Sequence, residues 1–302
     1  MTNDERLHNM KKLINFTDDR IVKRLRWIMV GTMLFSMLNT LAGQPESFWH
    51  TPETAIRGDG LSIHNATNHT FDFFLGHGWQ VYLLACLVYF SVAFFVVSIL
   101  PRTGALIAIF SFIFGHCYGA TNWLAVRWHM GMASPTIYGI VLGVILTFLA
   151  FAKANPRGPA IKRLRWIGVC VILLDCINTL VGQPRSYWQH PETVHEANSL
   201  SFFFLSRGYI YYCIYDLIYS GVVFLLASIL PEMIALVSIF SFIFGHFVGA
   251  SNWFFYEWRM GMEAPVIYGI VLSIAIVLLA FPRTQSRNKT LKNVPERTTI
   301  TT

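Results

Sequence analysis

Charged side chains are scarce in this sequence. Asp, Glu, Lys and Arg make up 13% of its 302 residues, whereas apolar types make up 54%. Soluble domains carry about 25% charged residues, so a soluble fold would leave much of this apolar surface uncovered. The net charge of +7 does not indicate nucleic acid, because the basic residues form short clusters between apolar runs. We expect a membrane protein in contact with a lipid bilayer and with no nucleic-acid partner.

Motifs for several enzyme classes are also missing. The five cysteines all fall inside apolar runs, which leaves no disulfide framework and no iron–sulfur spacing. The sequence contains no phosphate-binding glycine loop, no zinc-protease HExxH and no nucleophile elbow. These absences favour a protein that is not an enzyme and that carries no cofactor.

Eight apolar runs are long enough to cross a membrane as helices. A hydrocarbon core of about 30 Å takes roughly 20 helical residues. The runs do not alternate apolar and polar residues, so they do not fit the strands of a membrane barrel. We therefore predict an all-α integral membrane protein with spans at 27–43, 79–100, 104–126, 135–152, 166–182, 209–230, 233–256 and 265–281.

The basic residues predict the orientation of these spans. Of 23 Lys and Arg residues, 18 fall in the N-terminal segment, at Arg102, in the linker between spans four and five, or in the C-terminal tail. Such an excess marks the cytoplasmic side. We expect a multi-pass protein of the cell membrane with both termini in the cytoplasm.

The sequence repeats itself internally. Residues 101–152 match 231–282 without a gap, with 29 of 52 positions identical, and Lys-Arg-Leu-Arg-Trp at 23–27 recurs at 162–166. Four spans per copy is an even number, so the copies should share one orientation and be related by a pseudo-twofold axis along the membrane normal. The predicted parts are a cytoplasmic segment 1–26, repeat one at 27–152, a basic cytoplasmic linker 153–165, repeat two at 166–281 and a basic disordered tail 282–302.

Polar residues that recur in both copies are candidates for a ligand site. The end of span one carries Asn39 and Gln44, which recur as Asn178 and Gln183 at the end of span five. Asp175 lies three residues before Asn178 and shares its helix face. Because an ionisable residue inside a span is costly, it indicates function by default. The alternative is a protonated carboxyl that only bonds a neighbouring helix.

Two recurring histidines have the most versatile side chains among these candidates. The motif Ser-Phe-Ile-Phe-Gly-His-x-x-Gly-Ala-Thr/Ser-Asn-Trp places His116 and His246 in mid-span, where an imidazole can donate, accept, titrate or bind a metal. The glycines beside them form small-xxx-small pairs that favour close helix packing. If spans three and seven meet at the axis, the two rings could face one another around a ligand, haem or metal. A packing histidine bonded to Asn39 or Asn178 is the alternative. The asparagines of the motif, Asn122 and Asn252, point to a different face.

Further recurring residues lie at the predicted outer ends of the spans. The pattern Gly-Gln-Pro-x-Ser-aromatic-Trp-x-x-Pro-Glu-Thr is typical of a membrane interface, and its Pro-Glu-Thr could simply start a short helix. A second pattern, Trp-x-Met-Gly-Met-x-x-Pro-x-Ile-Tyr, predicts a tight turn into span four. Together they supply a candidate outer mouth formed by Trp49, Glu53, Trp188, Glu192, Tyr138 and Tyr268.

Three functions fit these patterns. The first is a small-molecule or ion carrier, or a ligand-binding membrane protein, with a polar site between the repeats. The second is a non-catalytic subunit or assembly factor of a larger membrane complex. The third is a haem or metal protein that uses His116 and His246. We expect the first.

Overall fold

A computed structural model describes residues 19–55, 69–131, 133–151, 159–196, 198–256, 258, 260–261 and 263–280. Every regular element in these residues is a helix. The predicted segment 1–26, the linker 153–165 and the tail 282–302 lie wholly or partly outside the described residues.

Eight described helices are long and apolar enough to cross a bilayer, which confirms the eight predicted spans. Helices satisfy their own backbone hydrogen bonds, as lipid requires. They are α2 (Asp19–Ala42), α4 (Trp79–Ile99), α5 (Arg102–Val126), α6 (Ala133–Ile145) with its π-helical continuation η5 (Leu146–Phe151), α7 (Pro159–Val181), α9 (Tyr209–Ile229), α10 (Glu232–Tyr256) and α11 (Glu263–Ala280).

Short helices connect the long ones on one side of the bundle. The two Pro-Glu-Thr sequences form single 3-10 turns, as one of the two interpretations predicted. Each follows another 3-10 turn that carries the tryptophan of the pattern. The short elements are η2 (Glu46–Trp49), η3 (Pro52–Thr54), α3 (His69–Gly76), η6 (Arg185–Trp188), η7 (Pro191–Thr193) and α8 (Ser199–Leu205).

Two helices begin earlier than their apolar runs suggested. α2 begins at Asp19 and α7 at Pro159, whereas spans were predicted from 27 and 166. The basic sequence at each start has a buried stripe, because Leu25 and Leu164 are completely buried. Ile21 and Ile161 are buried as well, so one face of each helix start packs on the bundle, while Lys23 and Lys162 on another face are exposed. The apolar runs in the sequence did not indicate these earlier starts.

The apolar surface of the bundle faces outward. Leu84 and Phe95 of α4 and Leu217 of α9 are each more than 60% exposed, although both helices are apolar enough to cross a membrane. Such surface is unfavourable in water and suits acyl chains. The structure thus places the protein in a lipid bilayer environment.

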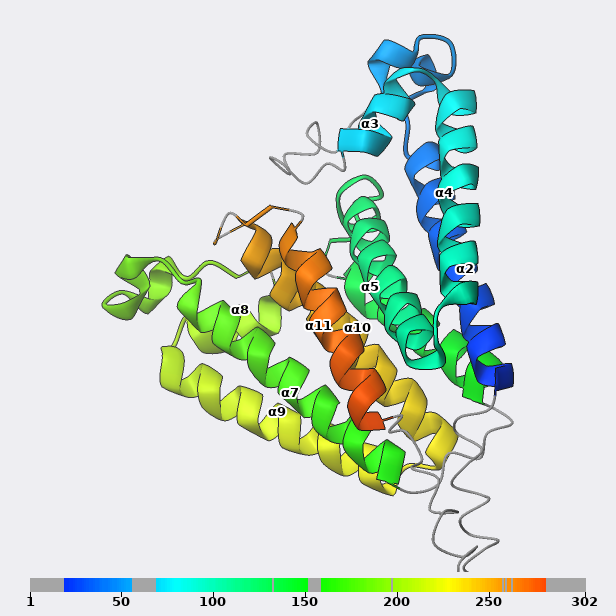
Figure 1. The fold of residues 1–302 in the computed structure, drawn as a ribbon. Coiled ribbons are helices and arrows are strands. Elements are labelled where there is room, and N and C mark those ends of the chain that lie inside the picture. The colour runs from blue at the N-terminus through cyan, green and yellow to red at the C-terminus, as the bar shows by residue number, and fades with distance from the viewer. Residues whose placement is uncertain are drawn as a thin grey trace, which may run out of the picture.

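Helices from the two halves of the chain pack on one another at the centre (Figure 1). α6 contacts α10, α11 contacts α5, and α5 contacts α10. α2 and α4 lie on one side of this centre, and α7 and α9 on the other. The α5–α10 contact is made by phenylalanines: the ring of Phe114 lies 4.8 Å from that of Phe244 and 4.7 Å from that of Phe247, centroid to centroid. The centre of the bundle is therefore apolar.

One tight helix crossing uses glycines that sequence analysis had not singled out. A Cβ on Gly143 of α6 would lie 2.6 Å from Ser241 Oγ and 2.7 Å from the Val237 carbonyl oxygen of α10. In the predicted close pairs, nothing lies within 4 Å of a Cβ on Gly115 or Gly245, whereas a Cβ on Gly249 would lie 2.7 Å from Asp175 Oδ2 of α7. Gly139-x-x-x-Gly143 is a further pair that allows close approach.

Candidate functional site

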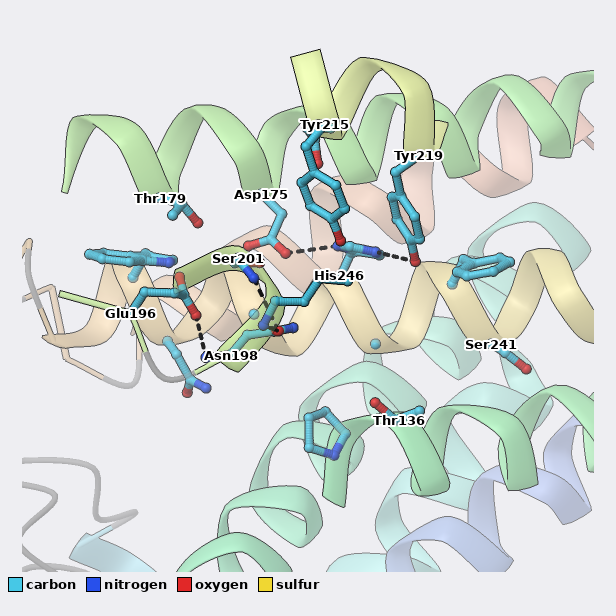
Figure 2. A pocket seen from close by; sticks show the side chains of 18 of the residues that line it. Thr136, Asp175, Thr179, Glu196, Asn198, Ser201, Tyr215, Tyr219, Ser241 and His246 are labelled. Carbon is cyan, nitrogen blue, oxygen red and sulfur yellow. Dashed lines mark hydrogen bonds and ion pairs between the residues drawn. The ribbon is translucent and has the colours of Figure 1, made fainter. Parts of the chain in front are cut away.

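A cavity of about 860 Å³ lies beside α10 in the second half of the chain (Figure 2). We call it the α10 cavity. α10 forms one wall from Val237 to Trp253, and residues of α7 and α9 form others. Five residues before and within α8 line it as well: His195, Glu196, Asn198, Leu200 and Ser201. Pro135, Thr136 and Ile140 of α6 line it from the first half. The cavity thus has walls from both halves but lies mainly within the second.

His246 is the centre of a hydrogen-bonded chain in this cavity. Its Nδ1 lies 2.8 Å from Asp175 Oδ2 on α7, and its Nε2 lies 3.3 Å from the Tyr219 hydroxyl on α9. An ionised carboxylate only accepts, so the imidazole donates from Nδ1 and, when neutral, accepts at Nε2 from the phenol. Figure 2 shows the three side chains converging from three helices. This arrangement can bind a polar group or hold and pass a proton.

The Asp175 carboxylate occupies space left by a glycine. A Cβ on Gly249 would lie 2.7 Å from Asp175 Oδ2 and 3.0 Å from Oδ1. Gly249 is one turn beyond His246 on α10, so the carboxylate can approach the helix and still reach the imidazole. The side chains of Asp175 and His246 are 18% and 22% exposed, which leaves both accessible from the cavity.

A second carboxylate lines the same cavity deeper in the protein. Asp216 of α9 is only 5% exposed, and its Oδ2 has no hydrogen-bond partner. Asp175 and His246 are close enough to influence it electrostatically. A buried carboxylate oxygen that lacks a donor is costly. The structure places Asp216 and Asp175 in the lining of one cavity.

Tyrosines complete the wall on α9. Tyr212, Tyr215 and Tyr219 all line the cavity together with Asp216. These four positions have the spacing i, i+3, i+4 and i+7, which is one face of a helix. This polar stripe inside an apolar span is the signal that sequence analysis missed.

The recurring asparagines and glutamines do not gather at the cavity. Asn39 donates to the Ala120 carbonyl at 3.1 Å and accepts from the Trp128 indole at 2.9 Å, so it ties α2 to α5. Asn178 is buried, its Nδ2 has no hydrogen-bond partner, and it is not a lining residue. Asn252 does line the cavity, whereas its match Asn122 does not. None of these four bonds a histidine ring in the described structure.

The two glutamines hold backbone just beyond the C-terminal ends of α2 and α7. Gln44 donates to the Thr40 carbonyl at 3.2 Å. Gln183 exchanges two 2.9 Å hydrogen bonds with the backbone of His195, whose segment lines the cavity. Gln183 therefore positions this wall and does not line the cavity itself.

His116 lies elsewhere. It is half-buried, its ring centroid lies 5.9 Å from that of Tyr89, and it is not among the residues that line the α10 cavity. The two imidazoles do not face one another across the α5–α10 contact, because Phe114, Phe244 and Phe247 fill it. The prediction of a ligand held between two histidines was wrong in this geometric respect. The reason is that each ring points toward a helix of its own half. His116 lies beside Tyr89 of α4, and His246 lies beside Tyr219 of α9.

The predicted outer-mouth residues line no part of this cavity. Trp49 contacts Trp79, and Trp188 contacts Tyr209, each pair joining a 3-10 turn to the start of a long helix. Glu192 pairs with His190 at 3.1 Å on the exposed surface. Glu53 belongs to the exposed turn η3, and Tyr138 and Tyr268 are buried against Phe35 and Phe247. The four aromatic residues pack against other rings, and the two glutamates are exposed.

Within the described residues, no group of three or more His, Cys, Asp or Glu side chains could hold a metal ion. Comparison with known proteins found no matching family model, no matching curated protein and no matching solved structure. The α10 cavity is therefore the feature of this protein that bears on its function.

Proposed function

We propose that this protein is a multi-pass membrane carrier, or ligand-binding membrane protein, whose binding site is the α10 cavity. The observation that carries the proposal is the chain Asp175–His246–Tyr219, which opens into about 860 Å³ of space among apolar helices. Ligand sites are typically concave and mostly apolar, with a few convergent polar groups. This cavity has that composition.

The cost of the buried polar groups supports a ligand rather than simple packing. A carboxylate taken out of water into an apolar bundle costs several kcal/mol unless it is well paired. Asp175 has a partner in His246, but Asp216 Oδ2 has none. A leucine or phenylalanine would stabilise the bundle better at that position. A residue kept at such a cost is most simply explained by something that binds it.

The proposed architecture is two tandem four-helix units related by a pseudo-twofold axis along the membrane normal. Its support is the repeated sequence together with the reciprocal packing of α6 on α10 and of α11 on α5. The backbone agrees, because Gly78 and Gly208 both have a positive φ immediately before α4 and α9. The excess of lysine and arginine around the starts of α2 and α7 supports an orientation in which these helix starts face the cytoplasm of a cell membrane.

A steric block provides the first test. Gly245 lines the cavity and nothing lies within 4 Å of a Cβ built on it, so Gly245→Phe fills the cavity without meeting the backbone. Gly115→Phe is the matched control, since it is equally open but lies outside the cavity. Each variant is purified in lipid nanodiscs, and small molecules extracted from it are compared by mass spectrometry. We expect a compound that co-purifies with wild type and Gly115→Phe and is lost from Gly245→Phe.

The proposal fails if wild type and Gly245→Phe, both shown by thermal melting to be folded, release the same compounds.

A second experiment separates a carrier from a binding protein. The compound identified by extraction is loaded outside sealed vesicles that contain the purified protein, and its entry is followed with time. A carrier accelerates entry, and His246→Ala abolishes that acceleration, whereas a binding protein gives a saturable signal without entry.

A further inference from the structure

Among the described residues, the charges around the α10 cavity are all of one sign apart from histidine. Asp175, Asp216 and Glu196 line it, whereas none of the described lining residues is a lysine or an arginine. His195 and His246 are the described lining groups that can become cationic. A site for an anion would need fixed positive charge or several free donors. This cavity repels anions unless both histidines are protonated.

A wall of stacked aromatic rings stands beside the carboxylates. Tyr215 and Tyr219 lie with centroids 6.0 Å apart and planes inclined by 22°. Tyr215 in turn stacks on Phe204 at 4.5 Å and 12°, which fixes the orientation of its ring. Aromatic faces attract cations, and quaternary ammonium groups are recognised by such rings. The tyrosines therefore complement the charge of the carboxylates.

Asp216 supplies an independent indication of a bound group. It is 5% exposed, it lines the cavity, and its Oδ2 lacks a hydrogen-bond donor. Asp175 lines the same cavity. Two carboxylates that share an apolar cavity are stabilised by a cation between them or beside them. Since the described lining holds no lysine or arginine, the ligand is the source of that cation.

Apolar side chains line another part of the cavity, namely Ile140 of α6 and Val237 and Phe242 of α10. Thr136, Ser238 and Ser241 lie among them, and the two serine hydroxyls already donate to carbonyls of α10 itself, at 2.9 Å and 2.7 Å. Ile140, Val237 and Phe242 offer no hydrogen bonds to the water around an ion. A hydrated metal ion would leave this part unfilled, whereas a hydrocarbon substituent would fill it.

From these contacts we infer that the ligand of the α10 cavity is an organic cation, an ammonium group that carries an apolar substituent. The ammonium lies between Asp175 and Asp216 and against the faces of Tyr215 and Tyr219, and the substituent lies along Ile140, Val237 and Phe242. The inference rests on the proposed function and specifies its substrate class.

Three probes that share a benzene ring but differ in charge test the inference. Benzyltrimethylammonium, benzyl alcohol and benzenesulfonate are titrated calorimetrically into the full-length protein in nanodiscs of uncharged phosphatidylcholine. We expect the ammonium to bind most tightly and the sulfonate not to bind. Asp216→Asn keeps the shape but removes the charge, and it should weaken ammonium binding by about tenfold or more. Glu192→Gln, an exposed carboxylate outside the cavity, should leave binding unchanged.

Should Asp216→Asn not fold, Tyr215→Leu removes the ring instead and should weaken the ammonium more than the alcohol. Equal binding of ammonium and alcohol, tighter binding of the sulfonate, or no binding of the ammonium overturns the inference. The proposed function survives such a result if extraction still finds a neutral or anionic compound that is lost from Gly245→Phe. It fails as well if extraction finds no such compound.

Discussion

His116 and His246 occupy matching positions in nearly identical sequence, yet their surroundings differ. His246 bonds Asp175 at 2.8 Å and Tyr219 at 3.3 Å. At the position that matches Asp175 the first copy has Ser36. Its hydroxyl is neutral, so it cannot balance the positive charge of an imidazolium. Tyr89 matches Tyr219, and its ring lies 5.9 Å from that of His116. The framework is shared, but the acid is present only once.

A second exchange follows the same direction. Asp216 matches Cys86 in the first copy. Both intramembrane carboxylates of the described helices that line the α10 cavity thus belong to the second copy. A duplicated bundle can keep one copy for packing while the other acquires polar groups, because each copy has its own set of helix contacts. The two copies thus differ by two carboxylates, and this difference places His246 in a charged site and His116 in a packed one.

The largest effect is expected when the acid of the pair is neutralised. Asp175→Asn should weaken binding of benzyltrimethylammonium by about a hundredfold, which corresponds to about 2.7 kcal/mol, because a buried charge partner is lost. Calorimetry in nanodiscs measures this change. Ser36→Ala, at the matching position, should change affinity less than about twofold. A similar loss in both variants would show that the two halves form one site.

Second in size is the exchange of two matching residues at the helix crossings. Gly143 of α6 matches Ser273 of α11, which is completely buried and bonds the Gly269 carbonyl at 2.6 Å. Gly143→Ser should destabilise the protein by about 2 kcal/mol, because its Cβ would meet Ser241 Oγ and the Val237 carbonyl oxygen within 2.7 Å.

Thermal melting in nanodiscs measures this loss. Ser273→Ala is the matched control, since it removes a hydroxyl that bonds within its own helix, and it should cost about 0.5 kcal/mol. If Gly143→Ser melts at the wild-type temperature, the two crossings are equally loose and the asymmetry is not structural.

A smaller effect is expected from one added methyl group beside each histidine. A Cβ on Gly249 would lie 2.7 Å from Asp175 Oδ2, whereas one on Gly119 would lie 3.8 Å from Ser36 Oγ. Gly249→Ala should therefore move the carboxylate away from His246 and weaken ammonium binding by about tenfold, within the 1–3 kcal/mol typical of overpacking. Gly119→Ala should leave binding unchanged, since 3.8 Å is an ordinary contact. Equal effects of the two alanines would contradict the difference described here.

The sequence was sufficient to predict the eight spans and to select Asp175 and His246. Apolar runs and intramembrane charge are local features that need no tertiary information. The pairing of His246 with Tyr219 depends on the rotation of α9 against α10, which the run of apolar residues in α9 does not fix. The approach of the segment 195–201 to the cavity depends on Gln183, whose hydrogen bonds to His195 join residues twelve apart in the chain.

The location of the site was harder to predict for a different reason. Similar copies suggested that matching residues meet at the axis, and the two histidines were therefore placed face to face. In the structure, phenylalanines such as Phe114 and Phe247 occupy that contact, because large apolar rings pack well at the centre of a bundle. Repetition in the sequence shows that residues are equivalent, and it does not show that they touch.

The smallest effect is expected from moving the acid to the other half. Asp175→Ser removes it from the second copy, and Ser36→Asp added to that variant places it beside His116, where Gly119 leaves room. The double variant should recover only about a tenth of the lost ammonium affinity, because the first copy has Cys86 in place of the second carboxylate. Calorimetry compares the single and double variants, and Ser36→Asn in place of Ser36→Asp controls for size. Full recovery would mean that one carboxylate beside a histidine is sufficient and that Asp216 is dispensable. No recovery with Ser36→Asp, in a protein that still folds, would mean that the walls of the second copy contribute more than its charge.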